Sequence, residues 1–270
     1  MRSPAAEPPP RTTGLPQAAA RTRFLPSRDG YPFGNDWPAA PALVVRTPLG
    51  PVGIGNAARG LCGGMVFAAL DHWHAGIPPP AGRPAPGSAH YRFIVRRLID
   101  SWNIPAGVLR YYRWMTLPPG GPAERTTSIW WPRVRAALDR GRPVPLGLVT
   151  VASADPLLLG HNHQVAAFCY EISDGTVRLS VYDPNRGPAD DVAIIIPAGD
   201  RPAEFPHNLG LDRPVRGFFP ARYSPVSPPG QAEWRRGGWI GDLRPGGGLL
   251  RPDQEAPSGD GIRADRPAAE

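Results

Sequence analysis

The spacing of the hydrophobic residues changes once along the chain, close to Pro143, and this change constrains the fold more than any other feature. Before it, apolar residues recur every three or four positions, which predicts helices over 62–75, 89–103, 107–115 and 126–143. After it, short apolar runs alternate with turn signals, which predicts strands over 143–151, 163–172, 177–183, 191–197 and 215–223. Helices followed by hairpin-connected strands are typical of an α+β domain with an antiparallel sheet.

Proline and glycine, with 38 and 32 of the 270 residues, are concentrated toward both ends of the sequence. The Pro/Ala/Arg-rich residues 1–27 predict a disordered arm, and the Gly/Pro-rich residues 228–270 predict a disordered tail. Residues 28–227 are then expected to form one folded domain, a length that suits a single hydrophobic core. Its first residues include aromatic side chains that we expect to anchor on that core, Tyr31, Phe33 and Trp37.

The charge and hydropathy of the chain exclude several classes of partner. The formal net charge is +7, and all 30 basic residues are arginines. They are spread along the chain, and no zinc-finger, helix-turn-helix or RNP pattern occurs, so we expect no nucleic-acid partner. No segment has the roughly 18 apolar residues that span a membrane, and the N-terminus lacks the apolar core of a secretory signal. We therefore expect no membrane partner and a cytoplasmic location by default, with export by another route left open.

Cys62, in the stretch GLCGGMVFAAL, lies at the start of the helix predicted over 62–75. A helix N-terminus and a nearby imidazole both favour thiolate over thiol, so a cysteine in this position is a candidate nucleophile. The glycines beside it would let a substrate backbone approach. A small buried core residue is the alternative interpretation of a lone cysteine.

A base and an acid for this cysteine can be found on two neighbouring predicted strands. His161 and His163 precede the strand over 163–172, and which of them is the base stays open. Asp183 ends the next strand, and SDG at 173–175 predicts a hairpin between the two. Antiparallel pairing about that turn places His163 close to Asp183. The sequence therefore predicts a Cys62–His163–Asp183 site, in which Asp183 orients the imidazole.

The order of these motifs resembles that of the papain-like cysteine peptidases, and more closely the bacterial peptidases that remove double-glycine leaders and their stand-alone relatives. The motifs are LCGG at 61–64, HQV at 163–165 and YDPN at 182–185, and the resemblance covers roughly residues 50–190. It implies a papain-like α+β fold, in which an N-terminal helical part packs its nucleophile helix on a C-terminal antiparallel sheet. It also implies a thiol hydrolase that cleaves a peptide or amide bond of a peptide or protein substrate, without a metal or other cofactor.

The resemblance also implies a residue for the oxyanion hole. The family pattern places a glutamine six positions before the cysteine, where its amide binds the oxyanion. Asn56 stands there in this sequence, one methylene shorter but with the same amide chemistry. Backbone N–H groups at the helix start, including that of Cys62, could share the role. The departure from glutamine leaves open a different reaction or a catalytically inactive relative.

Four alternatives stay open beside the hydrolase. An acyl transferase or transglutaminase-like enzyme would use the same residues with an amine in place of water, and a non-catalytic binding protein could keep the fold. A metal site would use His161, His163 and Asp183 as ligands. A disulfide between Cys62 and Cys169 would exclude catalysis, because Cys169 lies about 20 Å from His163 along the strand at ~3.3 Å per residue.

Overall fold

The structure is a computed structural model of the chain and describes residues 17–37, 43–47, 50–54, 60–199 and 202–230. The chain divides into a first unit of residues 1–237 and a second of residues 238–270, which lies outside the described ranges. In the first unit, helices pack on an antiparallel sheet, which confirms the predicted α+β class.

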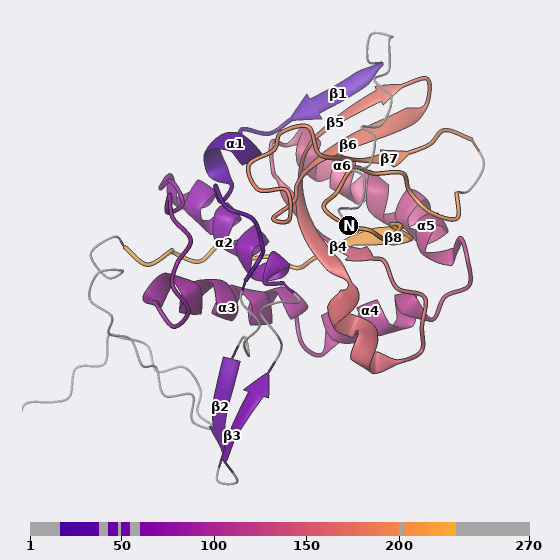
Figure 1. The fold of residues 1–270 in the computed structure, drawn as a ribbon. Coiled ribbons are helices and arrows are strands. Elements are labelled where there is room, and N and C mark those ends of the chain that lie inside the picture. The colour runs from indigo at the N-terminus through magenta and orange to yellow at the C-terminus, as the bar shows by residue number, and fades with distance from the viewer. Residues whose placement is uncertain (1–16, 38–42, 48–49, 55–59, 200–201, 231–270) are drawn as a thin grey trace, which may run out of the picture. The chain divides into compact units, whose positions relative to one another are not determined.

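The sheet has six strands, all antiparallel to their neighbours, and runs in the order β7-β6-β5-β4-β8, with β1 also paired to β5 (Figure 1). Its strands are β1 (Ala18–Arg21), β4 (Val144–Val149), β5 (His163–Ser173), β6 (Thr176–Tyr182), β7 (Ala193–Ile196) and β8 (Gly217–Pro220). The strands after Pro143 lie where the sequence predicts them. The turn between β5 and β6 contains Asp174 and Gly175, both with positive φ, as expected of a tight hairpin.

Strand β1 corrects the expectation that residues 1–27 form a disordered arm. Residues 18–21 pair with β5, and the bonds Gln17 N–H to Ile172 O (2.7 Å) and Thr22 N–H to Phe168 O (2.9 Å) continue the pairing at both ends. The folded part therefore begins before residue 28. The three alanines of β1 carry little hydrophobic signal, and backbone hydrogen bonds along β5 hold them in place.

The helices are α1 (Pro26–Asp29), α2 (Cys62–Ala75), α3 (Ala89–Trp102), α4 (Ala106–Met115), α5 (Gly121–Arg125) and α6 (Trp131–Asp139), with the π-helical η2 (Thr126–Trp130) and the 3-10 helix η3 (Pro156–His161). A separate hairpin joins β2 (Leu43–Thr47) to β3 (Gly50–Ile54). Helix α2 spans the predicted range, and α3 and α4 differ from theirs by one residue. The single helix expected over 126–143 is instead the succession of α5, η2 and α6, which begins earlier, at Gly121, and ends earlier, at Asp139. Pro122 suits the first turn of α5.

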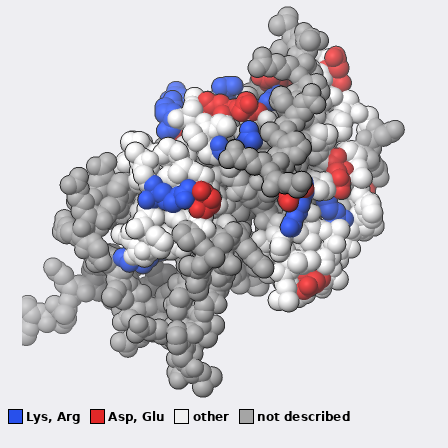
Figure 2. All heavy atoms as spheres, in the orientation of Figure 1, with Lys and Arg blue, Asp and Glu red and all other residues white. Residues whose placement is uncertain are grey.

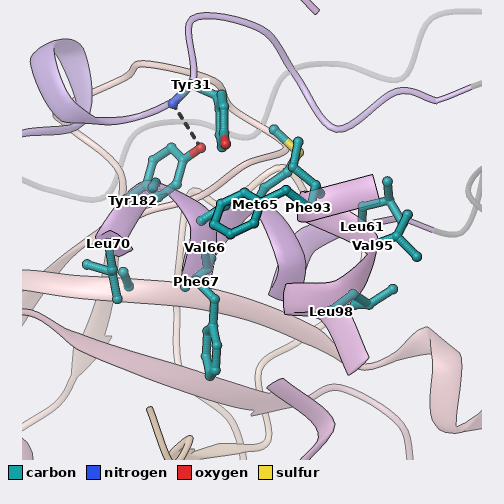
Figure 3. Packing of buried hydrophobic residues seen from close by; sticks show 14 of the residues in the cluster. Tyr31, Leu61, Met65, Val66, Phe67, Leu70, Phe93, Val95, Leu98 and Tyr182 are labelled. Carbon is teal, nitrogen blue, oxygen red and sulfur yellow. Dashed lines mark hydrogen bonds between the residues drawn. The ribbon is translucent and has the colours of Figure 1, made fainter. Parts of the chain in front are cut away.

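Strand β5 is buried on both faces, and this burial positions the helices. Ala166 and Phe168 belong to a core cluster with residues of α2 and α3 (Figure 3), whereas Val165 and Ala167 belong to a second cluster with α6. Alternate side chains of a strand point to opposite faces, so helices cover this part of the sheet on both sides. Helix α2 is therefore fixed directly against the strand that begins with His163.

Residues 30–37 form a bent, non-helical segment that leads from α1 to the residue before α2, where Asn35 contacts Leu61. Tyr31 and Trp37 are buried and Phe33 packs against the same cluster, as the sequence predicts for these aromatic anchors. The Tyr31 N–H donates to the hydroxyl of Tyr182, the last residue of β6 (3.2 Å; Figure 3). The segment is thereby tied to the residue that precedes Asp183.

The described surface carries both signs of charge. On the face drawn in Figure 2, basic and acidic side chains lie beside one another, and ion pairs join Arg28 to Asp29 and Arg83 to Asp36. Within the described ranges, no helix is long and apolar enough to cross a membrane.

Candidate active site

Cys62 is the first residue of α2, and its side chain is 8% exposed. The next residue, Gly63, lies so close to β5 and α3 that a Cβ there would be 2.3 Å from Ser101 Oγ and 2.8 Å from the Gln164 amide. A larger residue there would have to displace the Ser101 or Gln164 side chain, which gives a reason for a glycine after the cysteine. The start of α2 is thus held tightly against the start of β5.

His163 begins β5, and Asp183 directly follows the end of β6. Ala166 of β5 is paired with Tyr182 of β6, so the hairpin register brings the two functional side chains together, as the sequence predicts. Nε2 of His163 and Oδ1 of Asp183 are 2.7 Å apart, and the residues are 4% and 0% exposed. A buried imidazole and a buried carboxylate therefore form a hydrogen-bonded pair.

The Cys62 thiol completes this group, because it lies beside the His163 ring, close enough for each group to shift the pKa of the other. Since Nε2 of His163 binds Asp183, the nitrogen that faces the sulfur is Nδ1. The backbone N–H groups of Gly63 and Gln164 also lower the pKa of the thiol. The structure therefore brings Cys62, His163 and Asp183 together in one row, with the imidazole in the middle.

The electrostatics of this row favour a charged Cys62–His163 pair. Burial by itself would raise the pKa of the Cys62 thiol, but the charge of His163 and the hydrogen bonds at the sulfur lower it below its usual value. Burial would likewise lower the pKa of His163, but Asp183 and Cys62 raise it to about 10. A lowered thiol pKa beside a raised imidazole pKa favours a thiolate–imidazolium pair over the neutral thiol and imidazole.

Asp183 stays ionised because its own surroundings stabilise the carboxylate. Burial would raise its pKa, yet His163 and two backbone N–H groups lower it. The N–H of Gly210 donates to Oδ2 (2.8 Å), and the N–H of Asn185 donates to Oδ1 (2.9 Å). Neither donor stands out in the sequence, because each reaches Asp183 through its backbone.

A cavity of about 720 Å³ opens beside His163. Its walls combine backbone-exposing glycines with amide and charged side chains, among them Gly60, Asn35, Asn162, Asn185 and Arg213. Gly60 brings the loop before Cys62 to the cavity wall, whereas Cys62 itself does not line the cavity. His163 therefore borders the cavity directly, whereas Cys62 is next to a residue of its wall.

Two polar side chains behind the row were not predicted. Gln164 is buried, and its Nε2 donates to Ser101 Oγ (3.1 Å) beneath the start of α2. The Tyr111 hydroxyl donates to the backbone oxygen of His163 (3.4 Å), and Gly147 leaves room for it, since a Cβ there would be 2.3 Å from that hydroxyl. Sequence patterns do not reveal these contacts, because they join α3 and α4 to strands far along the chain.

The other predicted residues and alternatives have different outcomes. Asn56 lies outside the described residues. His161 lines the cavity, but it is His163 that binds Asp183. Over the described part of the chain, no group of three or more His, Cys, Asp or Glu side chains could hold a metal ion. Cys62 and Cys169 are both free thiols, so the disulfide alternative is not supported.

The arrangement can activate a thiol and protonate a leaving group, because one imidazole contacts both the sulfur and a buried carboxylate.

No family model matches the chain, and searches of curated proteins and of solved structures found no match.

Proposed function

We propose that this protein is a thiol hydrolase that cleaves a peptide or amide bond through Cys62, His163 and Asp183. The observation that carries the proposal is the position of His163, which is hydrogen-bonded to the Asp183 carboxylate through Nε2 and contacts the Cys62 thiol. Three residues far apart in the sequence occupy the places of nucleophile, base and orienting acid.

In the proposed reaction, the Cys62 thiolate attacks the carbonyl carbon and forms a carbon–sulfur bond. The tetrahedral intermediate collapses, the carbon–nitrogen bond breaks, and His163 Nδ1–H gives its proton to the leaving amine. Water then attacks the thioester while His163 accepts its proton. The second tetrahedral intermediate collapses, the carbon–sulfur bond breaks, and the acid product leaves the thiolate–imidazolium pair of Cys62 and His163 restored. Asp183 keeps the ring oriented and stabilises its charged form throughout.

The start of α2 is the natural place to bind the developing oxyanion. The first turn of a 14-residue helix presents backbone N–H groups that have no acceptor within the helix, and it carries the positive end of the helix dipole. Donors that are already fixed in place stabilise a tetrahedral oxyanion without further reorganisation. By resemblance, the Asn56 amide would be a second donor.

The arrangement of the elements supports a papain-like interpretation of the α+β fold. The nucleophile begins a helix that packs on an antiparallel sheet, and the base and the acid lie on neighbouring strands of that sheet. The same order of cysteine, histidine and acid led to the resemblance with papain-like peptidases. The bacterial leader peptidases and their stand-alone relatives remain the closer comparison within that group.

The cavity beside His163 supports a peptide or protein as the substrate. Its volume of about 720 Å³ falls in the range of known ligand sites, roughly 300–1,000 Å³. Glycine backbones along its wall offer hydrogen bonds to a polypeptide main chain.

Thiol reactivity tests the nucleophile. Iodoacetamide labelling of the full chain is followed by mass spectrometry between pH 5 and pH 9, with Cys62→Ala and Cys169→Ala as matched variants. We expect Cys62 to be labelled at pH 6 at least tenfold faster than a free thiol, whose thiolate fraction there is below about 1%. Labelling of Cys62 no faster than that of a model thiol at pH 6 would overturn the proposal.

Turnover distinguishes the hydrolase from its alternatives. Incubation with a peptide library should produce new carboxyl ends, with Cys62→Ala as the control. If the products instead carry an added amine such as hydroxylamine or glycinamide in preference to water, the enzyme is an acyl transferase. A reactive Cys62 with no covalent product from any peptide would favour a binding protein that keeps the fold.

A further inference from the structure

A single asparagine, Asn35, ties the nucleophile loop to the acid loop; these names denote residues 60–61, which lead into Cys62, and residues 184–185, which follow Asp183. Oδ1 of Asn35 accepts a hydrogen bond from the backbone N–H of Leu61 (2.8 Å), the residue before Cys62. Nδ2 of Asn35 donates to Oδ1 of Asn185 (3.0 Å), two residues after Asp183. One side chain therefore bridges two segments of the site that lie far apart in sequence.

The contacts themselves determine how both amides are oriented. The Leu61 N–H can only donate, so the atom that faces it must be the oxygen of Asn35. At the other end, Nδ2 of Asn185 donates to the Gly210 carbonyl oxygen (3.1 Å), which turns Oδ1 of Asn185 toward Asn35. From Leu61 to Gly210, each group in the series donates a hydrogen bond to the next one. Turning either amide over would place a donor against a donor or an acceptor against an acceptor.

Both ends of this chain of hydrogen bonds touch the catalytic row. The N–H groups of Asn185 and Gly210 donate to the Asp183 carboxylate, while the Leu61 N–H directly precedes Cys62. The Asn35 N–H adds a second tie to the acid loop, because it donates to the Pro184 carbonyl oxygen (3.0 Å).

The backbone beside Asn35 leaves room for its side chain. Gly60 has a φ of 102°, and a Cβ there would lie 2.6 Å from Nδ2 of Asn35. A larger residue at this position would be strained and would also displace the amide. From the opposite side, Arg83 holds the segment by donating to the carbonyl oxygens of Asp36 (2.8 Å) and Gly34 (3.3 Å).

We propose that Asn35 and Asn185 are positioning residues that fix the nucleophile loop against the acid loop, and thereby the Cys62 sulfur against the His163 ring. The proposal rests on the function proposed above. The pKa of Cys62 depends on its contact with His163, and that contact needs the loop to stay in register with the Asp183–Asn185 segment. A displacement of about 1 Å in such a site can cost about a hundredfold in rate.

Two alanine variants test the proposal through the pH dependence of Cys62 labelling in the full chain. Asn35→Ala removes both side-chain bonds of the bridge, and Asn185→Ala breaks it at a half-buried position where the backbone N–H to Asp183 is kept. We expect Cys62 to be labelled about tenfold more slowly at pH 6 in each variant. The reason is that the pH midpoint of its labelling moves up by about one unit, toward that of a free thiol.

Thr126→Val is the matched control for lost stability. The buried Thr126 hydroxyl accepts from the Phe218 N–H (2.8 Å) and donates to the Pro122 oxygen (2.9 Å), so this variant also loses buried hydrogen bonds. Unfolding in urea should show that Thr126→Val is less stable than wild type. The pH midpoint of Cys62 labelling should nevertheless stay within about 0.2 pH units of wild type, because sites that are far apart are usually not coupled. The double variant Asn35→Ala/Asn185→Ala should shift the midpoint no further than Asn35→Ala alone, since both act through one hydrogen bond.

The outcomes separate this proposal from the proposed function. If wild-type Cys62 is not labelled faster than a free thiol at pH 6, the proposed function fails, and the positioning role fails with it. If the wild type is labelled rapidly but Asn35→Ala and Asn185→Ala keep its midpoint, as Thr126→Val does, only the positioning role is overturned. If Asn35→Ala is hard to obtain folded, a midpoint shift of about one pH unit in Asn185→Ala, with no shift in Thr126→Val, supports the positioning role by itself.

Discussion

Oδ1 of Asp183 lies 2.7 Å from Nε2 of His163, and this contact fixes which nitrogen of the ring remains for Cys62. The carboxylate is itself held from two sides by the N–H groups of Asn185 and Gly210, so it cannot rotate away without leaving donors unpaired. The imidazole orientation is thus determined by the fold and does not depend on a bound substrate.

Asp183→Asn should remove the activation of Cys62 while keeping the shape of the site. The neutral amide no longer raises the pKa of His163, and its NH2 group cannot accept a backbone N–H. We expect labelling of Cys62 at pH 6 to fall more than tenfold, and the free energy of unfolding to fall by about 1–3 kcal/mol for the unpaired buried donor. Iodoacetamide kinetics and urea unfolding provide both measurements.

The control for this substitution is Asp155→Asn, which changes an exposed aspartate whose Oδ1 accepts the Leu157 N–H (2.9 Å). An asparagine oxygen can make the same bond, so neither quantity should change. If both variants behave alike, the Asp183 charge has no role in the reactivity of Cys62.

The hairpin made this part of the site predictable from the sequence. The SDG turn fixes the β5–β6 register, and register alone places Asp183 beside His163. Likewise, the apolar spacing after Cys62 gives the bounds of α2, which in turn gives the cysteine its place at a helix start. Both predictions follow from the local spacing of apolar residues and from one hairpin turn.

The contacts that the sequence did not predict join segments that lie far apart along the chain. Strand β1 is held by backbone hydrogen bonds to β5, which leave no pattern in its own alanines. Asn35 reaches Leu61 and Asn185 only because the aromatic anchors Tyr31 and Trp37 carry the segment across the core. No spacing rule connects an asparagine to a cysteine that lies so far along the chain.

A buried histidine pair predicts how stability depends on pH. His72 and His90 lie with ring centroids 5.5 Å apart, and the Tyr31 hydroxyl is 2.7 Å from Nε2 of His90. Burial lowers the pKa of His72 to about 4 and that of His90 to about 3. Between pH 6.5 and 4 the unfolded chain therefore binds more protons than the folded one, and stability falls as the pH falls.

Each histidine should contribute a slope of up to about 1.4 kcal/mol per pH unit in that window. Urea unfolding of wild type and His90→Gln at pH 7, 6 and 5 measures it, and the variant should lose about half of the slope. His163 contributes in the opposite direction over part of this range, because its folded pKa is about 10 and the unfolded histidine gains its proton only around pH 6.5. This contribution is common to wild type and His90→Gln and cancels in their difference. Equal slopes for wild type and His90→Gln would contradict charge-free burial of the pair.

Gly64 should be needed for the contact between α2 and α3. A Cβ at Gly64 would lie 2.2 Å from the Ile94 carbonyl oxygen, a backbone atom that cannot move alone. We expect Gly64→Ala to lower the free energy of unfolding by about 1–3 kcal/mol through overpacking. The matched control is Gly82→Ala, where a Cβ meets nothing within 4 Å, and thermal unfolding should show little change there. Equal melting temperatures for the two variants would contradict such a close helix contact.

The buried pair of Arg97 and Asp71 ties the segment after β8 to α2 and α3. Nε of Arg97 and Oδ2 of Asp71 are 2.7 Å apart, and both side chains are nearly inaccessible. Oδ1 of Asp71 also accepts from the Tyr223 hydroxyl (2.8 Å) and the Val226 N–H (3.0 Å). Burial raises the pKa of Asp71 even though Arg97 and these donors lower it.

Arg97→Met should therefore leave an uncompensated buried carboxylate and lower the free energy of unfolding by about 3 kcal/mol at pH 7. The pKa of Asp71 in the folded variant would rise further above its unfolded value. The protonated carboxyl group therefore stabilises the fold at low pH, and this stabilisation is lost as the pH rises through the folded-state pKa. The deficit relative to wild type should consequently shrink between pH 7 and pH 5. Arg135→Met, which breaks an exposed pair 4.0 Å long, should leave the unfolding midpoint nearly unchanged in the same urea series. A deficit for Arg97→Met that stays constant from pH 7 to pH 5 would show that the lost contacts of Arg97 with Phe67 and Tyr223 matter more than its charge.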